Sequence, residues 1–297
     1  MIDLHCHTTN SDGTWTVEEL LKKAQEINLE VLSITDHDSV KSYFEIQKNK
    51  ELQNIFKGNI IDGVELNCVF DGIKIEALAY DFDLDKVNNW LDEYYTPEKN
   101  RNGLIEEFND LVDICKKQGI KIEKDLKYNP YTEYPVDVIY YSIIKFEENK
   151  KFFTEEQWTS KSVFFRTCTV DKSFPLYRDF SKQMPTLEFL SEFIHKCGGK
   201  IFLAHLYKYK LNNHIEYLDN IIEKKLIDGI EVYHSSFTKE QIQTLEQYCK
   251  NNKLLMSGGS DCHGERKKER KLGIGYGNLN INKKILANWH IKSIFQF

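Results

Sequence analysis

The sequence predicts an α/β fold, in which one barrel of strands and helices is interrupted by an inserted segment. Short apolar runs typical of β-strands alternate with amphipathic helical segments in residues 1–82 and again from residue 186 onward. The chain has 297 residues, 41% of them hydrophobic, which is enough to bury one large core. Histidines and carboxylates follow the strand-like runs, and side chains in such positions meet at one rim of a barrel.

The N-terminal third is expected to alternate strands and helices. Strands are predicted at residues 2–6, 30–35, 59–64 and 74–80. Thr16 and Glu19 have the spacing of a capping box, which predicts a helix that begins at this point. A second helix is expected over about residues 40–49, with Asp38 or Ser39 as its N-terminal cap. This order favours a largely parallel barrel.

The alternation breaks between about Asp83 and Pro185, where a helix near residues 103–117 precedes an aromatic stretch without a strict period. We expect residues 97–185 to form an inserted, mainly helical lid subdomain over the barrel mouth. The barrel would then consist of residues 1–96 and 186–297. In its second part, helices are predicted at residues 186–196, 214–225 and 239–251, and strands at residues 200–204, 228–233 and 254–257.

The charge and the apolar runs exclude several classes of partner. The net charge is −6 and the isoelectric point about 5.9, which argues against a broad basic surface for duplex nucleic acid. No apolar run approaches the roughly 20 residues needed to span a bilayer, and the chain starts without a signal-like region. We therefore expect a cytoplasmic protein that binds neither duplex DNA nor membranes.

The seven cysteines are widely spaced and include no C-x-x-C pair, so neither a disulfide framework nor a zinc knuckle is indicated. Cys6 and Cys262 each lie between two candidate metal ligands. Because alternate residues of an extended segment point in opposite directions, both are expected to face away from the metal and to pack.

Candidate metal ligands recur from end to end of the chain. His5 and His7 lie two residues apart on an extended segment, so their imidazoles leave the same face and can hold one ion. Further clusters of matching chemistry follow other strands; they contain Asp12, His37, Glu65, His205, Asp261 and His263. Imidazole and carboxylate together suit zinc, manganese or iron, whereas magnesium and calcium sites are usually all oxygen. The pattern predicts a multinuclear transition-metal site.

The motifs DLHCHT, SDG, ITDHD, GVE, AH and GSDCHG together resemble the PHP family, the polymerase and histidinol phosphatase superfamily of metal-dependent phosphoesterases. The resemblance covers residues 1–82 and 186 to about 275. It implies a distorted (βα)7 barrel with up to three divalent ions held by nine residues. It implies as ligands here His5, His7, Asp12, His37, Glu65, His205, Asp261 and His263, with Glu65 bridging two ions.

One position departs from the family pattern. About eleven residues after GVE the family usually has a histidine, whereas this chain has Glu76. A carboxylate can ligate the same metals, so Glu76 is predicted as the ninth ligand. The alternatives are that this ion is weakly held or absent, or that Glu76 is a solvent-facing strand residue. With Asp12, Glu65 and Asp261 it would place four negative charges in one pocket, which two divalent ions would neutralise.

The family resemblance implies a hydrolase that acts on phosphoric esters. Length and insertion are most similar to the branch that hydrolyses nucleoside 3′,5′-bisphosphates or short RNA from the 5′ end. We expect hydrolysis of a phosphomonoester of a small phosphorylated nucleotide, by attack of metal-bound hydroxide, with two to three Mn²⁺, Zn²⁺ or Fe²⁺ ions. The alternatives are a histidinol-phosphate-type or other small-molecule phosphatase, a 5′-3′ exonuclease on short RNA, and a metal-binding module with decayed catalysis.

Glu65, Asp261 and His234 are the predicted catalytic residues, with His234 as a substrate contact or a proton donor to the leaving group. The predicted substrate contacts are Arg101, Asn102 and Lys208. Asp3 and Asp36 could orient imidazole N–H groups or cap the local backbone. The charge run at residues 266–271 is typical of a solvated loop, and it could also fold over the pocket.

Overall fold

The computed structural model describes residues 1–169, 174, 176–179 and 183–292. The chain divides into two compact units. We call Met1–Cys68, Ile75–Leu91 and Pro185–Phe297 the barrel unit, and Val69–Lys74 with Asp92–Met184 the helical unit. This division differs from the expected one because residues 69–74, the tip of a strand hairpin, belong to the helical unit. The predicted position of residues 97–185 over the barrel mouth stays a prediction.

The strands form two sheets. The first has the order β1-β2-β3 and contains β1 (Ile2–Asp3), β2 (Val31–Leu32) and β3 (Asn59–Ile60), all parallel. The second has the order β4-β5-β6-β7-β8 and contains β4 (Gly63–Phe70), β5 (Ile73–Tyr80), β6 (Lys200–Leu203), β7 (Gly229–His234) and β8 (Leu255–Gly259). The pairs β6–β7 and β7–β8 are parallel, whereas β5 and β6 are antiparallel. The barrel is therefore largely parallel, as expected, except at β5.

The reversal at β5 has a local cause. Asp71 and Gly72 join β4 to β5, and both have positive φ angles, 49° and 66°. An Asp-Gly pair in this conformation is the preferred two-residue connection of a hairpin, because its twist matches that of the flanking strands. The predicted strands end at residue 64 and begin again at residue 74, whereas β4 continues to Phe70 and β5 begins at Ile73.

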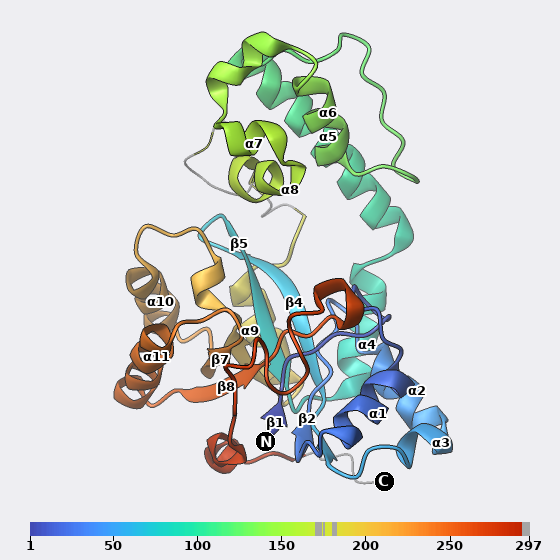
Figure 1. The fold of residues 1–297 in the computed structure, drawn as a ribbon, viewed down its shortest axis with the longest axis vertical. Coiled ribbons are helices and arrows are strands. Elements are labelled where there is room, and N and C mark those ends of the chain that lie inside the picture. Colours follow the sequence, from blue (N-terminus) through green and yellow to red (C-terminus); the bar gives the residue numbers. More distant parts are fainter. Residues whose placement is uncertain (170–173, 175, 180–182, 293–297) are drawn as a thin grey trace. The chain divides into compact units, whose positions relative to one another are not determined.

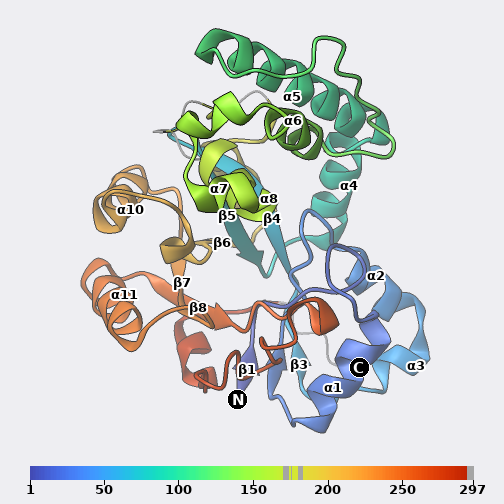
Figure 2. The same ribbon diagram turned by 45° about the horizontal axis from the view of Figure 1, so that its top comes forward.

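Two parallel bridges join the two sheets into a closed barrel. Cys6 pairs with Cys262, and His37 pairs with Glu65. Hydrogen bonds extend these contacts, for example from the His7 amide to the Cys262 carbonyl at 2.9 Å. If β3 and β4 count as one position, the ring has seven strands, which agrees with the predicted distorted barrel. Figures 1 and 2 show helices outside these strands, with α10 and α11 beside β7 and β8.

The barrel unit contains α1 (Val17–Glu26), α2 (Lys41–Lys48), α3 (Lys50–Gln53), α9 (Leu187–Lys196), α10 (His214–Glu223) and α11 (Lys239–Asn252), and α4 (Leu84–Tyr94) begins in it. The capping box at Thr16 and Glu19 is confirmed. The predicted cap of α2 was wrong, because Val40 occupies that position. The Asp38 carboxylate instead accepts hydrogen bonds from the backbone and side-chain nitrogens of Asn67 in β4.

The helical unit contains α5 (Pro97–Gln118), α6 (Pro135–Ile143), α7 (Glu155–Thr159) and α8 (Lys161–Phe164), with a 3₁₀ helix at Glu147–Phe152 and a π-helical turn at Phe165–Thr169. Its core is formed by apolar side chains of α5, α6 and α8, among them Leu111, Cys115, Ile139 and Phe164. Thr96 caps α5 and Gly119 ends it in the left-handed conformation, so this helix is longer than the predicted residues 103–117.

In the first strand segment of the barrel unit, alternate side chains face the apolar core, and those between them are free to face the site. Ile2 and Leu4 pack with Phe202 and Trp289 in one cluster of buried residues, and His5, next in sequence to Leu4, faces the carboxylates of the site.

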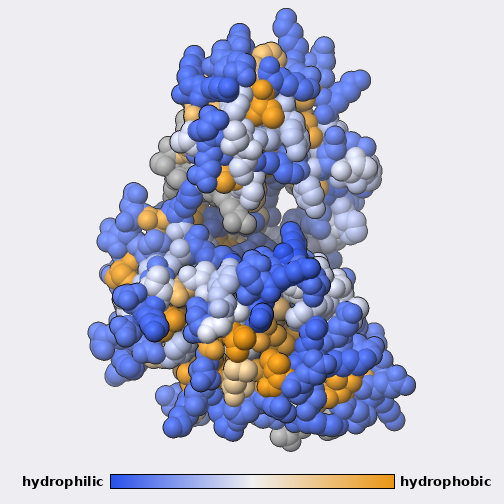
Figure 3. Space-filling model, viewed as in Figure 1, coloured by the Kyte–Doolittle hydropathy of each residue, from blue (hydrophilic) through white to orange (hydrophobic). Residues whose placement is uncertain are grey.

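On the face of the molecule in Figure 3, hydrophilic side chains predominate. None of the described helices is long and apolar enough to cross a membrane.

Candidate metal centre

The candidate ligands lie at the ends of barrel strands or inside them. His5 and His7 follow β1, His37 follows β2, and Asp261 with His263 follows β8. Glu65 and Glu76 lie within β4 and β5, and His205 lies two residues after the end of β6. Two of these residues have positive φ angles, 21° for His205 and 53° for Asp261. Such strained conformations in non-glycine residues cluster at functional sites, where the surrounding structure holds them in place.

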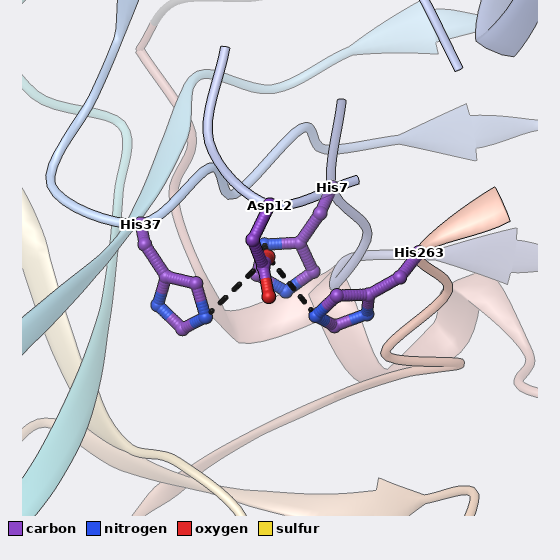
Figure 4. Close-up of side chains that lie close together, drawn as sticks. All are labelled: His7, Asp12, His37 and His263. Atoms are coloured by element: carbon purple, nitrogen blue, oxygen red, sulfur yellow. Dashed lines mark ion pairs between the residues drawn. The ribbon is translucent and has the colours of Figure 1, made fainter. Parts of the chain in front are cut away.

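One group of candidate ligands consists of His7, Asp12, His37 and His263, each of which offers an atom within 4.8 Å of the others. Figure 4 shows the three imidazoles arranged around the Asp12 carboxylate. Asp12 Oδ1 lies 3.1 Å from His263 Nε2 and 3.8 Å from a ring nitrogen of both His7 and His37. Three imidazoles and one carboxylate form a ligand set that suits a transition-metal ion.

Glu65 lies at the centre of the remaining candidates. Its Oε1 is 2.8 Å from His205 Nε2, and its Oε2 is 3.1 Å from His5 Nε2 and 3.3 Å from both His7 Nε2 and His37 Nδ1. The side chain is 1% exposed. Glu65 therefore belongs to two groups of potential ligands, one with His5 and His205 and one with His37 and Glu76.

A further group contains His5, His7 and Asp261. Asp261 Oδ1 lies 3.4 Å from His7 Nε2 and 3.8 Å from His5 Nε2. The four overlapping groups together include every predicted ligand: His5, His7, Asp12, His37, Glu65, Glu76, His205, Asp261 and His263. Glu76 points toward this cluster, with its carboxylate 3.1 Å from His205 Nε2 and its side chain 23% exposed.

Several buried atoms of these side chains lack a hydrogen-bond partner among the described residues. They are both ring nitrogens of His7, Asp12 Oδ1, His37 Nδ1 and His205 Nδ1. Buried polar atoms are nearly always hydrogen-bonded, so a cluster of unpaired ones calls for a bound group. Imidazole nitrogens and carboxylate oxygens that converge within 4.8 Å fit divalent transition-metal ions.

The protonation of the cluster reflects its burial and its internal charges. Burial opposes the charged form of Glu65, yet the facing imidazoles of His5 and His37 hold its pKa well below the usual range. Burial lowers the pKa of His7 to about 4, so this imidazole is neutral near pH 7. Burial and Lys208 both oppose protonation of His205, but Glu65 and Glu76 raise its pKa to about 9. A metal ion therefore competes with a proton at His205.

Glu231 in β7 orients two of the histidines and was not assigned this role from the sequence. Its Oε1 lies 2.7 Å from His5 Nδ1, and its Oε2 accepts the backbone N–H of His205 at 2.8 Å. A carboxylate on one ring nitrogen fixes the orientation of a metal-binding histidine and leaves the other nitrogen for the metal. His5 Nε2 accordingly faces Glu65.

Asp3 and Asp36 do not orient imidazoles in the structure. Asp3 accepts the backbone N–H groups of His5, Ser260 and Gly273. Asp36 accepts hydrogen bonds from Thr8 and from the hydroxyl groups of Ser11 and Ser42. Asp3 and Asp36 therefore bind local backbone and hydroxyl groups, as in the second of the two interpretations. Cys6 likewise packs, with its thiol donating to the Ser33 carbonyl at 3.3 Å.

Glu231→Gln is expected to weaken metal binding about 10- to 100-fold, because the amide keeps one acceptor and presents an N–H₂ group to a donor. Calorimetric titration of the metal-free protein with Mn²⁺ would measure the change. Glu246→Gln is a matched control. Glu246 lies in α11 and accepts a hydrogen bond from the hydroxyl group of Tyr233 in β7, away from the candidate ligands. Equal affinities of the wild type and the Glu231 variant would contradict the orienting role.

His234 lies beside Asp261 and is fully buried. The backbone N–H of Ser236 donates to His234 Nδ1 at 3.2 Å, so the ring proton resides on Nε2. Nε2 lies 3.3 Å from Asp261 Oδ2 and can donate to it. Burial lowers the pKa of His234 to about 4, which keeps the ring neutral. His234 therefore holds the Asp261 carboxylate in position by a hydrogen bond. Proton donation by His234 to a leaving group stays a prediction.

The three predicted substrate contacts fall in different units. Lys208 follows β6, and its Nζ lies 3.2 Å from Asp261 Oδ2 in the site. Arg101 and Asn102 lie in α5 of the helical unit, where the Arg101 guanidinium lies over the Tyr131 ring at 5.4 Å. A substrate contact by Arg101 or Asn102 stays a prediction.

Comparisons with known proteins agree with this geometry. The family described as PHP domain matches residues 3–265. A 5′-3′ exoribonuclease of Haemophilus influenzae is 26% identical over 279 residues, which cover 88% of this chain and 89% of that protein. The 5′-3′ exoribonuclease Rnm of Escherichia coli is 34% identical over 82 residues, or 28% of each chain.

Two solved structures resemble the fold. A protein of Bifidobacterium adolescentis, described as a metal-dependent phosphoesterase, has a TM-score of 0.59 and 23% identity, with 96% of this chain and 95% of that chain covered. An amidohydrolase of Chromobacterium violaceum has a TM-score of 0.60 and 21% identity, with 91% and 89% covered. These likenesses show that the fold is shared.

Proposed function

The chain belongs to the PHP domain family, and on that premise we propose that it is a metal-dependent phosphoesterase whose reaction takes place at the cluster around Glu65. The observation that carries this proposal is the convergence of nine imidazole and carboxylate side chains in four overlapping groups, with several buried ligand atoms unpaired. We propose all nine as metal ligands, Glu76 included, and Glu65 as the residue that serves two ions.

Divalent ions bound here would polarise the phosphoryl group and activate a water molecule at neutral pH. The protein side chains fix the arrangement. Glu65 and Asp261 would supply negative charge to hold the ions, while Glu231 and His234 orient His5 and Asp261 by hydrogen bonds. The reaction consumes one water, whose oxygen bonds to phosphorus while the ester P–O bond breaks and the leaving alcohol takes up a proton.

The proposed substrate is a small phosphorylated nucleotide, such as a nucleoside 3′,5′-bisphosphate. An acidic protein with a local metal centre suits a compact anionic substrate better than a long duplex. A second candidate is short RNA cleaved from its 5′ end, which the name of the Haemophilus influenzae relative favours. The two candidates differ in the bond that breaks, a phosphomonoester in the first and a phosphodiester in the second.

The test is to incubate the Mn²⁺-loaded protein with adenosine 3′,5′-bisphosphate and, separately, with a short 5′-phosphorylated RNA. We expect inorganic phosphate from the bisphosphate, and a chelator should abolish its release. Mononucleotides from the RNA, without phosphate from the bisphosphate, would move the assignment to the exonuclease. If neither substrate nor generic phosphate esters react with any of Mn²⁺, Zn²⁺ or Fe²⁺, the phosphoesterase proposal is wrong.

A further inference from the structure

The loop that follows His263 turns basic side chains toward the metal centre. Within the charge run of residues 266–271, the side chain of Lys268 is 75% exposed, as expected of a solvated loop, but Lys267 is 29% and Arg270 only 12% exposed. The loop is also anchored. The Gly273 amide donates to Asp3 Oδ2 at 2.7 Å, and Lys271 forms an antiparallel bridge with Gly275. The expectation of a solvated loop was therefore wrong for Lys267 and Arg270.

Three cations converge on Asp261 from two segments of the barrel unit. Lys208 Nζ lies 3.2 Å from Asp261 Oδ2, and Lys267 Nζ lies 3.9 Å from Oδ1. Arg270 Nη1 forms an ion pair with Oδ2. The Tyr276 hydroxyl accepts a hydrogen bond from Arg270 Nε at 2.9 Å, which fixes the guanidinium in this direction.

The charges of this group do not balance. One carboxylate faces three cations, so two positive charges remain uncompensated by Asp261 itself. The nearby Glu65 and Glu76 belong to candidate metal groups, as Asp261 itself does, so they leave no spare negative charge for these cations. Charged groups that are partly desolvated need counter-charge, and a phosphate dianion carries the amount that is missing.

We propose that Lys208, Lys267 and Arg270 bind the reacting phosphoryl group beside the metal centre and select a phosphomonoester over a phosphodiester. This proposal rests on the phosphoesterase function and specifies its substrate class. A monoester is largely dianionic above pH 6, whereas a diester carries one negative charge. In the transition state, charge spreads over three equatorial oxygens, which the guanidinium fork and two ammonium groups can contact where metal ions do not.

The test uses the Mn²⁺-loaded full chain and compares p-nitrophenyl phosphate with methyl p-nitrophenyl phosphate, in which one phosphate oxygen carries a methyl group. Arg270→Ala and Lys267→Ala are each expected to lower kcat/KM for the monoester about 10- to 100-fold, as loss of a hydrogen bond to a charged group does. The diester should change about threefold or less, so the ratio of the two values falls. Lys268→Ala is the matched control, and it should leave both values unchanged.

Equal losses on both esters, or no loss on either, would overturn the selection of a monoester. Thermal melting of each variant separates misfolding from lost recognition, and Lys267→Ala is the safer variant because Lys267 is the more exposed. If the wild type cleaves neither ester, calorimetry with inorganic phosphate still tests the cations, while the nucleotide assays above decide the phosphoesterase proposal. Both variants should then bind phosphate about tenfold more weakly than the wild type and Lys268→Ala. Unchanged phosphate affinity would contradict the proposal.

Discussion

Glu65→Gln is expected to lower kcat/KM for phosphoester hydrolysis by at least about a thousandfold, because bound ions contribute several kcal/mol to the stabilisation of transition-state charge. Glu65 contacts His5, His7, His37 and His205 and belongs to two candidate ligand groups. Neutralising it would remove charge from two ion positions at once. Phosphate release and metal content by atomic emission, measured on the same preparation, would check this result.

Glu76→Gln provides a graded comparison within the same cluster. Glu76 is 23% exposed and belongs to one candidate group, whereas Glu65 is 1% exposed and belongs to two. We therefore expect the Glu76 variant to lose less activity and fewer bound ions than the Glu65 variant. A Glu76 variant with full metal content would show that this glutamate is no ligand, and a Glu65 variant with normal activity would refute the central role of Glu65.

The sequence was sufficient to locate the candidate ligands that the structure brings together, because the pattern of each one is local. His5 and His7 share a face of an extended segment whatever that segment pairs with. Asp261 and His263 share the same spacing after β8. Barrel closure then brings these separate segments together, through the parallel bridges Cys6–Cys262 and His37–Glu65. The fold class and the positions of most strands followed from the same alternation of apolar residues.

The orienting role of Glu231 could not be predicted, because the direction of its side chain depends on irregular strand pairing. In β7, strict alternation would place Glu231 and Tyr233 on one face and His234 on the other. The register against β8 shifts between Glu231 and Tyr233, so the strand bulges. Glu231 and His234 consequently both face the site, while the Tyr233 hydroxyl contacts Glu246 of α11.

The basic loop illustrates the same limit. The side chains of Lys267, Lys268 and Arg270 could point in any direction as far as the sequence shows, because no long helix or strand contains this segment. Its direction is set by contacts distant in sequence, namely the Gly273 amide on Asp3 and the Glu265 amide on the Thr14 hydroxyl. These contacts, with the Lys271–Gly275 bridge, hold the loop so that Lys267 and Arg270 point toward Asp261 while Lys268 points to solvent.

Removal of the metal ions should lower the melting temperature of the protein by roughly 10 °C. An ion present at about a thousand times its dissociation constant stabilises the folded state by about 4 kcal/mol, and each kcal/mol corresponds to about 2–4 °C in a domain of this size. The buried carboxylate of Glu65 adds to the effect, because without ions it depends on the facing imidazoles of His5 and His37 for compensation.

Differential scanning calorimetry with and without a chelator would measure this shift. The Glu65→Gln variant shows whether the stabilising ions bind at the cluster around Glu65 or elsewhere. A variant that no longer holds the ions should melt at nearly the same temperature under both conditions. Its metal-free form should be less stable than the metal-free wild type, because the imidazoles that face Glu65 lose their counter-charge. If the chelator shifts the variant as much as the wild type, the stabilising ions bind elsewhere, and the cluster around Glu65 is not the metal centre.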